Sequence, residues 1–504
     1  MTLLSRARVL VAIGLMAAGA ACTPAPRSQP ATASAAAVTA SAASAQAGFA
    51  PLALDYATPA VVGTPVRVSA TGLPPGKVVD LVWGTVSGGW VIEDYYHFRG
   101  KKYSETTAPL GRFTVDAGGA LQARFTIPED FGGVHEVTAI IDGTPVAQNG
   151  INVTQTFELS PTSGPVGTPL ELKITGLGWR TMESTWVVNW DNQQLGFLTA
   201  AGTRGSAVAR FRASGPAGDH TVKLYTGWQA QAYLNYEQSP VADLPRPQFT
   251  FTTTAGQTGV SAYAEPYRAQ PLPKTEVSLP GAALTLKPSQ GPVGTRAVLR
   301  GTGFTAGERL QLAWQTAVGS RVSGNGFAAE DRTLGAVDVR ADGSIEWPFV
   351  IPEDLGGVHG VAVMKGTAPM ATTHFAIETS IVEMTPRSGP AGTPVTIHLK
   401  GVGWTEYDNI YVATYDNAYM GYACGFNSQG DVVINFTAAG APGAHLIDLY
   451  PGIYQGPASE PQQLYRQPQL TYADDHPGNL IPALRFLFEV TPGPTARTAV
   501  RTHE

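Results

Sequence analysis

The sequence predicts an all-β protein made of four tandem β-sandwich domains in the order A-B-A-B. Charged residues make up only 14% of the 504 residues, whereas glycine (57) and proline (39) are abundant, a balance that favours strands and turns. Apolar and polar residues alternate over short runs such as 121–127, which is typical of strands with one buried face. Beyond the N-terminus, no stretch shows the 3.6-residue apolar spacing of a long helix.

A short turn motif opens each of the four segments. Its fullest form is Ser163–Pro169, and the other copies centre on Gly63, Gly294 and Gly392. Proline fixes φ and glycine accepts positive φ, so the motif predicts a turn that leads into a first strand. A phosphate-binding loop is excluded because no helix with Lys-Ser/Thr follows.

Comparison of the segments indicates that a pair of domains was duplicated as a unit. The stretch Ile127–His135 recurs as Ile351–His359, 224 residues later, and Trp179 recurs as Trp404, 225 residues later. Near-equal shifts in the two halves give the A-B-A-B order. The expected domains are 51–155 (A1), 156–256 (B1), 283–378 (A2) and 379–494 (B2), with a linker at 257–282 and a disordered tail at 495–504.

The repeated pattern resembles the IPT/TIG group of immunoglobulin-like domains. It consists of a Pro-x-x-Gly-x-x-Gly-Thr opening, a Gly-apolar turn and a late Gly-x-His-x-Val strand, and it covers nearly all of 51–494. The first copy departs from it, with Thr58-Pro59-Ala60 in place of Ser-Gly-Pro. The resemblance implies small β-sandwiches used as spacers, adhesive modules or dimerisation modules on extracellular proteins, and it implies no active site.

The N-terminus has the pattern of an export signal. Arg6 and Arg8 precede an apolar run, Val9–Met16, that is too short to span a membrane, and small residues then lead to Cys22. This succession resembles the lipobox of bacterial lipoproteins, which implies a signal peptide at 1–21, acylation of Cys22 and an Ala/Ser/Pro-rich tether at 22–50. We therefore expect an exported protein that is lipid-anchored to the bacterial cell membrane or outer membrane, with its domains facing the periplasm or exterior. Gly19 stands where the family usually has Leu, so plain secretory cleavage is the alternative.

Charge and motif content argue against several functions. A net charge of −6 leaves no basic footprint for nucleic acid. Gly-x-Ser-x-Gly, His-Glu-x-x-His and close Cys/His clusters are missing, so we expect no enzyme, no catalytic residues, no cofactor and no metal site. Lipidation of Cys22 would leave Cys424 alone, without an intramolecular disulfide.

One histidine recurs near the start of a late strand in every domain: His135, His220, His359 and His445. We expect each ring to bond the backbone, as a tyrosine often does at this corner of sandwich domains. Metal ligation is the alternative, but four histidines about 100 residues apart lack a second local ligand.

Two other repeated motifs could likewise have a structural role or a binding role. The Pro-Glu-Asp stretches at 128–130 and 352–354 are expected to sit in water or cap a turn, with calcium binding as the alternative. Trp190-Asp191-Asn192 and Tyr415-Asp416-Asn417 are expected to form turns, with a binding role as the alternative.

The two A domains differ by one insertion. From Trp83 to Leu110 the first takes 27 steps, whereas from Trp314 to Leu334 the third takes 20. Exposed aromatics beside bases suit sugar faces, anionic polymers or a protein partner. The candidate binding residues are Trp90, Tyr95, Tyr96, His97, Arg99, Lys101, Lys102 and Tyr103. The alternative is that these residues extend a hairpin and pack on the neighbouring domain.

Together these patterns predict a non-catalytic surface lipoprotein that acts as a structural spacer or adhesion module of the bacterial envelope. Its expected partners are the membrane, through the anchor at Cys22, and an envelope polysaccharide or a surface protein. A polysaccharide- or ligand-binding protein that uses the aromatic loop of A1 is the first alternative. An accessory subunit of an envelope enzyme complex is the second.

Overall fold

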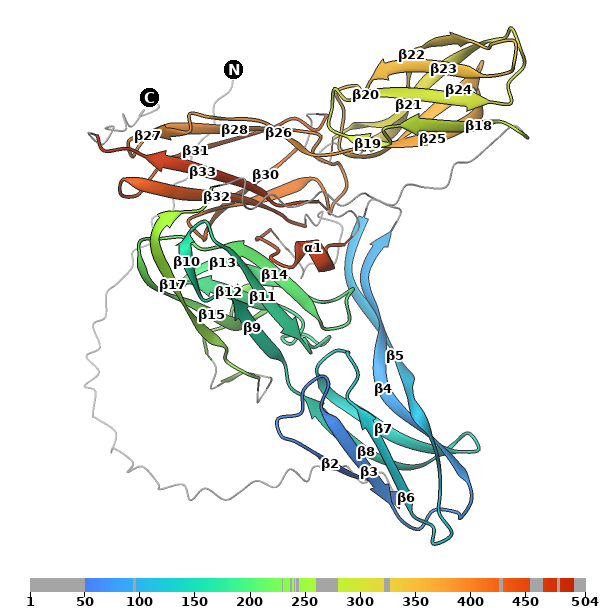
Figure 1. Ribbon diagram of the computed structural model, residues 1–504, viewed down its shortest axis with the longest axis vertical. Coiled ribbons are helices and arrows are strands. Elements are labelled where there is room, and N and C mark those ends of the chain that lie inside the picture. The colour runs from blue at the N-terminus through green and yellow to red at the C-terminus, as the bar shows by residue number, and fades with distance from the viewer. Residues whose placement is uncertain are drawn as a thin grey trace, which may run out of the picture. The chain divides into compact units, whose positions relative to one another are not determined.

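The fold of this protein is almost entirely strand. The computed structural model describes residues 50–93, 97–228, 230–235, 238, 239, 241, 244–259, 280–320, 327–425, 429–453, 466–477 and 481–493 (Figure 1). Over these residues the only helix is α1 (Tyr472–Asp475), and no helix is long and apolar enough to cross a membrane. The expected all-β fold of four tandem immunoglobulin-like sandwiches in A-B-A-B order is confirmed. The predicted signal peptide, Cys22 and the C-terminal tail lie outside the described residues, as do most of the tether and of the linker.

Both A domains pair a three-stranded sheet with a five-stranded one. In A1 the sheet orders are β2-β3-β6 and β1-β8-β7-β4-β5, and in A2 they are β18-β20-β23 and β19-β25-β24-β21-β22. The A1 strands are β1 (Ala50–Pro51), β2 (Ala53–Tyr56), β3 (Pro65–Ala70), β4 (Val78–Glu93), β5 (His97–Thr114), β6 (Leu121–Thr126), β7 (Gly133–Ile141) and β8 (Thr144–Val153). The A2 strands are β18 (Ala283–Lys287), β19 (Gln290–Gly291), β20 (Arg296–Thr302), β21 (Arg309–Gly319), β22 (Phe327–Asp338), β23 (Ile345–Val350), β24 (Gly357–Lys365) and β25 (Ala368–Ile377).

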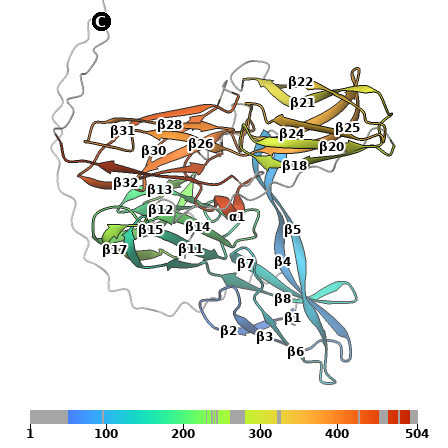
Figure 2. The same ribbon diagram turned by 45° about the horizontal axis from the view of Figure 1, so that its top comes forward.

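The B domains follow the same plan. Their sheet orders are β14-β11-β9 and β10-β17-β15-β12-β13 in B1, where β16 also pairs with β15, and β26-β28-β31 and β27-β33-β32-β29-β30 in B2 (Figure 2). The B1 strands are β9 (Thr156–Ser160), β10 (Ser163–Val166), β11 (Pro169–Thr175), β12 (Trp186–Trp190), β13 (Gln193–Leu198), β14 (Ala207–Arg212), β15 (Gly218–Trp228), β16 (Gln231–Ala232) and β17 (Gln248–Gln257). The B2 strands are β26 (Ser380–Thr385), β27 (Ser388–Gly389), β28 (Pro394–Lys400), β29 (Ile410–Tyr415), β30 (Ala418–Cys424), β31 (Val432–Thr437), β32 (Gly443–Pro451) and β33 (Leu484–Val490).

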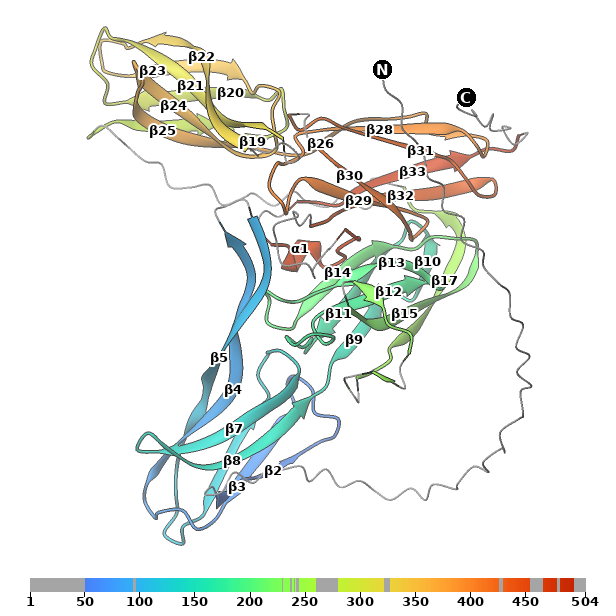
Figure 3. The same ribbon diagram turned by 180° about the vertical axis from the view of Figure 1, so that it is seen from behind.

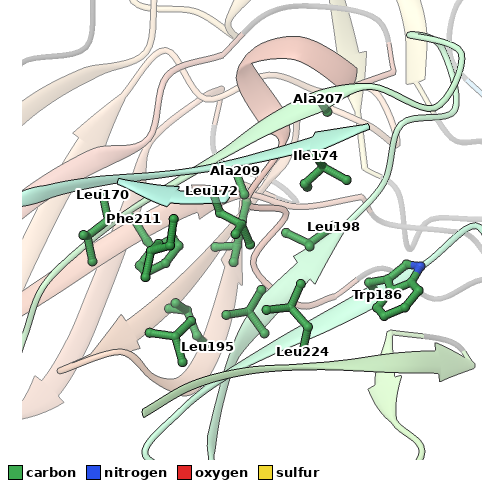
Figure 4. Close-up of a cluster of buried hydrophobic side chains, with 14 of the residues drawn as sticks. Leu170, Leu172, Ile174, Trp186, Leu195, Leu198, Ala207, Ala209, Phe211 and Leu224 are labelled. Atoms are coloured by element: carbon green, nitrogen blue, oxygen red, sulfur yellow. The ribbon is translucent and has the colours of Figure 1, made fainter. Parts of the chain in front are cut away.

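Alternating side chains build a core between the two sheets of each domain. Along β6, Leu121, Ala123 and Phe125 are buried while the residues between them are exposed. In B1, Leu172 and Phe211 of one sheet point toward Leu224 of the other (Figure 4). Four buried clusters, one centred in each domain, follow from this pattern.

The repeated opening motif is a turn, as its residues predict. In B1 the Thr168 N–H donates to Pro165 O at 3.1 Å, and the Thr168 hydroxyl donates to the same oxygen at 2.6 Å. Gly167 has a φ of 89°, which strains any residue with a Cβ. The motif therefore reverses the chain just before β11.

The repeated histidine makes the expected corner hydrogen bonds in all four domains. In A1, His135 Nε2 lies 2.7 Å from Phe131 O and Nδ1 lies 2.8 Å from Gly84 O. In B1, His220 Nε2 lies 2.8 Å from Pro216 O, but Nδ1 lies 2.5 Å from the Asp191 carboxylate. His359 and His445 repeat these two arrangements. Each ring also stacks on the aromatic residue of a neighbouring strand, with centroids 4.3–5.5 Å apart.

The repeated acidic motifs divide in the structure. Asp191 and Asn192 have φ values of 49° and 65°, and Asp416 and Asn417 repeat them, so the predicted turns are confirmed. The glutamates of Pro-Glu-Asp are exposed to water, whereas both aspartates are buried and cap the turn by accepting the N–H groups of Phe131 at 2.9 Å and Leu355 at 2.8 Å. Asp130 is 1% exposed and accepts the indole N–H of Trp83 at 3.0 Å. Asp354 and Trp314 repeat this contact at 2.8 Å.

Each A domain is joined to its B domain by the same close contact. The Gly132 N–H donates to Leu177 O at 3.1 Å, and the Gly356 N–H donates to Val402 O at 3.0 Å. A Cβ on Gly132 would lie 2.0 Å from Gly176 O, so only glycine fits there. The two joints are thus copies of one another, like the domains they connect.

The B domains contact each other through a long B2 segment between β32 and β33. Its residues Pro468 and Leu470 exchange backbone hydrogen bonds with Phe197, at 2.8 and 2.9 Å, and so cover the edge strand β13. Leu470 and Tyr472 then complete the buried B1 cluster. The core of B1 therefore includes side chains from B2.

Candidate functional site

The candidate binding residues lie on the long hairpin formed by β4 and β5. The two strands pair along their length, whereas β4 pairs with β7 only from Asp80 to Trp83. Beyond Trp83 the hairpin continues as two strands (Figures 1 and 3). Its strands have 16 and 18 residues, against 11 and 12 for β21 and β22 in A2. The extra residues of A1 therefore lengthen this hairpin.

Trp90 anchors the hairpin to the B2 segment. Its indole N–H lies 2.7 Å from Asp475 O and 3.2 Å from Asp475 Oδ1. Its ring centroid lies 5.7 Å from that of Phe98, whose side chain is fully buried and whose N–H donates to Glu406 Oε2 at 2.7 Å. The small cluster around them consists of Phe98, Phe197, Ala230 and Ile453. The hairpin thus packs on B1 and B2 together.

The neighbouring candidates also make contacts within the chain. Lys101 Nζ donates to Ser184 Oγ at 2.8 Å and lies 5.7 Å from the centre of the Trp90 ring. The Tyr103 ring lies 5.8 Å from that of Trp179 in B1, and the matched pair Phe327–Trp404 repeats this contact in the second half. These positions therefore hold the joint between an A and a B domain.

The remaining candidates are more exposed or lie outside the described residues. Arg99 Nε donates to Glu93 Oε2 at 2.5 Å within the hairpin. His97 is half-buried and Lys102 is exposed. Tyr95 and Tyr96 lie outside the described residues. Trp90, Lys101 and Tyr103 therefore pack on the neighbouring domains, as in the alternative interpretation. Binding of an outside partner by the eight candidate residues stays a prediction.

Asp475 is the electrostatic centre of this contact. Its carboxylate accepts the N–H groups of Ala201 at 2.8 Å and Gly202 at 2.6 Å. Burial raises the pKa of Asp475, and hydrogen bonds and the nearby Lys101 charge oppose that rise. Burial lowers the pKa of Lys101 to about 8 and that of His476 to about 4, so His476 is neutral at pH 7.

Sequence reasoning missed Glu406 and Asp475. One signal was available, because the expected B2 segment (379–494) is longer than B1 (156–256), which indicates an insertion. The docking place of that insertion carries no local pattern, since Trp90 and Asp475 lie 385 positions apart.

Two pockets flank the stem of the hairpin. One, of about 600 Å³, is lined by residues that include Ser87, Gly88, Trp90, Lys102, Gly202 and His476. The other, of about 570 Å³, lies where β4 separates from β7 and is called the fork pocket here. Its lining includes Thr85, Glu105, Thr107, Glu136, Trp179 and Arg180.

The predictions on metal sites and cysteines concern residues outside the hairpin. Over the described part of the chain, no group of three or more His, Cys, Asp or Glu side chains is placed to hold a metal ion. Cys22 lies outside that part, and Cys424 is half-buried on β30.

Comparisons with known proteins add only distant structural likenesses. No protein-family model matches the chain, and no curated protein matches it. A solved tetra-tandem repeat from the extending region of a large adhesion protein aligns over 88% of this chain and 100% of its own, with 13% identity and a TM-score of 0.18. The D1–D4 ectodomain fragment of ICAM-5 aligns over 87% and 100%, with 13% identity and a TM-score of 0.18. The eight N-terminal Ig domains of DSCAM align over 88% and 46%, with 11% identity and a TM-score of 0.17. Likenesses this weak carry no functional argument.

Proposed function

We propose that this chain is a non-catalytic lipoprotein of the bacterial envelope that acts as a structural spacer or adhesion module. In this proposal Cys22 carries the lipid, and the four immunoglobulin-like domains are of the IPT/TIG type. The observation that supports it best is the tandem of four sandwich cores behind an N-terminal segment with the lipobox pattern. Such domains offer strand faces and loops to partners.

The contacts between domains suit a spacer that keeps its geometry. The A–B joint is repeated at Gly132 and Gly356, and the hairpin of A1 is fastened to B2 at Asp475. Domains connected by a linker alone move relative to one another by default. Additional contacts restrict that motion and favour a fixed arrangement of A1, B1 and B2.

The anchor is tested by changing each cysteine in turn. The wild-type protein should incorporate labelled palmitate and sediment with membranes, whereas the Cys22→Ser variant should do neither. Cys424→Ser is the matched control and should behave like the wild type. Labelling that persists in Cys22→Ser and disappears in Cys424→Ser would overturn the anchor assignment.

A second candidate function is binding of an envelope polysaccharide or a surface protein by the A1 hairpin. Lys102 is exposed and lines the same pocket as the half-buried Trp90, which favours this function. Sedimentation of the purified chain with isolated cell walls measures this binding. Lys102→Ala should reduce sedimentation, whereas Lys77→Ala, on the same domain outside the hairpin extension, should leave it unchanged. Equal sedimentation of both variants would exclude the hairpin charge as a determinant.

A further inference from the structure

The fork pocket arises from the way the long hairpin leaves its sheet. After Trp83 pairs with Val137, β4 loses its partner β7 and continues with β5 alone. The separating strands and the Trp179 loop of B1 enclose a space of about 570 Å³. Pockets that hold small ligands in proteins measure about 300–1,000 Å³. The fork pocket is therefore large enough for a ligand of two or three sugar rings.

Its polar side chains are unoccupied by partners of their own. The Oγ1 atom of Thr85 is buried without a hydrogen bond, although the side chain lines the pocket and the residue is only 8% exposed. Within the described residues, the carboxylates of Glu105 and Glu136 form no hydrogen bond or ion pair, and both are exposed to solvent. The matched Thr316 hydroxyl of A2 is buried without a hydrogen bond as well, so this feature belongs to both A domains, and the unpaired carboxylates are what distinguishes the A1 pocket.

The rest of the lining supplies an apolar wall and a donor. Trp179 is half-buried, and the guanidinium of Arg180 lies 4.9 Å from the centre of its ring. The closest carboxylate oxygen recorded for Arg180 is Glu183 Oε2, at 3.8 Å, which leaves most of its N–H groups for other acceptors. Acceptors, hydroxyls, a donor and an aromatic ring thus converge on one space.

The matched place in A2 is built differently. Gln315 replaces Gly84, and its side-chain oxygen lies over Gly360, which replaces Glu136; a Cβ on Gly360 would come within 2.0 Å of that oxygen. Ala329 replaces Glu105, and its neighbour Glu330, opposite Thr316, forms an ion pair with Arg332 at 3.0 Å. The two unpaired carboxylates of the lining are therefore particular to A1.

This chemistry selects among ligand classes. Sugar hydroxyls both donate and accept hydrogen bonds, so they can satisfy carboxylates, threonine hydroxyls and a guanidinium together. Sugar rings also present an apolar face that packs on aromatic side chains. The two carboxylates outnumber the single arginine, and the resulting negative charge disfavours phosphate and acidic sugars.

We propose that the fork pocket binds a neutral oligosaccharide, with Glu105 and Glu136 accepting sugar hydroxyls, Arg180 donating to the ligand and Trp179 covering an apolar ring face. The proposal extends the proposed envelope function by naming a ligand class. It rests on that function because an envelope location is what would bring the chain into contact with oligosaccharides. The binding itself is measured with purified components, so its failure leaves the anchor experiment untouched.

The test titrates the full-length chain, solubilised in detergent, with cellotriose and chitotriose by isothermal calorimetry. At least one of the two should bind, and trigalacturonic acid should bind at least about tenfold more weakly. Glu136→Gln and Glu105→Gln should each weaken binding about tenfold, because each removes a charged acceptor. The A2 variant Glu330→Gln, which removes a carboxylate from the corresponding strand β22, should leave binding unchanged.

Folding is controlled in the same variants. Neither glutamate has a partner to lose, so thermal unfolding of Glu136→Gln and Glu105→Gln should match the wild type, and reduced binding then reports on the pocket. The proposal is overturned if neither neutral trisaccharide binds at millimolar concentration, or if the double variant binds as well as the wild type. A stronger response to a lysine-containing peptide than to either sugar would assign the pocket to a cationic ligand and would also overturn it.

Discussion

Four histidines share one repeat position, yet their surroundings divide them into two kinds. In the A domains the ring lies between backbone oxygens, and burial lowers the pKa of His359. In the B domains the ring contacts a turn aspartate, and the hydrogen bond that His445 donates to Asp416 raises the pKa of His445. The same residue in the same corner therefore couples folding to pH in opposite directions.

Stability should respond to pH with opposite signs at these two positions. The contribution of His445 is fully present below the unfolded pKa of about 6.5 and is lost as pH rises through its higher folded pKa. His359 resists protonation when folded, so its contribution decreases as pH drops below about 6.5. Urea unfolding of His445→Gln and His359→Gln on both sides of that pH gives the dependence of the unfolding free energy on pH. This dependence should differ from that of the wild type in opposite directions for the two variants. A change in the same direction for both would contradict this assignment.

At the residue scale, the sequence predicted what repeats locally. The hydrogen-bonded histidine corner could be predicted because the histidine follows the same kind of turn in four copies. The burial of Asp130 could not be predicted, because its partner Trp83 lies 47 positions away and an aspartate in a Pro-Glu-Asp stretch usually faces water. Long-range pairing decides the environment of such a residue, and a local pattern does not report it.

The A–B joint is an element in which two backbones touch. Gly132→Ala would place a methyl group about 2 Å from Gly176 O, so one of the two loops must move. Overpacking of this kind costs about 1–3 kcal/mol. We expect Gly132→Ala and its counterpart Gly356→Ala to lower the free energy of unfolding by similar amounts. Gly421→Ala, with no atom within 4 Å of the added group, is the control and should change little. A neutral Gly132→Ala variant would contradict the contact.

Trp90 is one of the residues that hold the far end of the hairpin, together with Phe98 and Lys101. Trp90→Ala removes an indole that packs on Phe98 and leaves Asp475 with fewer hydrogen bonds, so we expect a loss of about 2–4 kcal/mol in unfolding free energy. Lys102→Ala, on the same strand pair but exposed, should change the free energy by less than about 0.5 kcal/mol. Denaturant unfolding measures both. Equal stabilities would show that the hairpin is not fastened at Trp90.

At the element scale, the insertion in A1 was visible in the sequence but its use was not. The count between Trp83 and Leu110 predicts a longer connection, and the structure makes it a longer hairpin. The aromatic composition of the insertion predicts that its side chains make contacts, but it does not indicate which surface they contact. Aromatic residues serve a binding face and a packing face equally well, so composition alone leaves the two interpretations open.

Across the whole molecule, the B domains are locked by a buried charge cluster. Asp448 accepts hydrogen bonds from Arg212 of B1 and Arg485 of B2, and all three side chains are at most 3% exposed. Removal of one member of a buried ion pair costs about 3–5 kcal/mol because a charge is left without compensation. Asp448→Ala should therefore destabilise B1 and B2 together, as followed by hydrogen exchange in both domains. The exposed Asp219→Ala variant is the control, and protection lost from only one of the two domains would contradict the coupling.

The segment that completes B1 imposes an order on synthesis. The ribosome makes β13 well over 200 residues before Pro468 and Leu470, which cover its edge, and before Tyr472, which fills its core. A1 holds its own core residues between Leu52 and Val153 and can fold as soon as they emerge. The nascent B1 domain, by contrast, waits with an unpaired strand edge, a state prone to pairing with other chains. Chains that end early in B2 would carry this exposed edge permanently, so a segment translated late in B2 protects a domain made well before it.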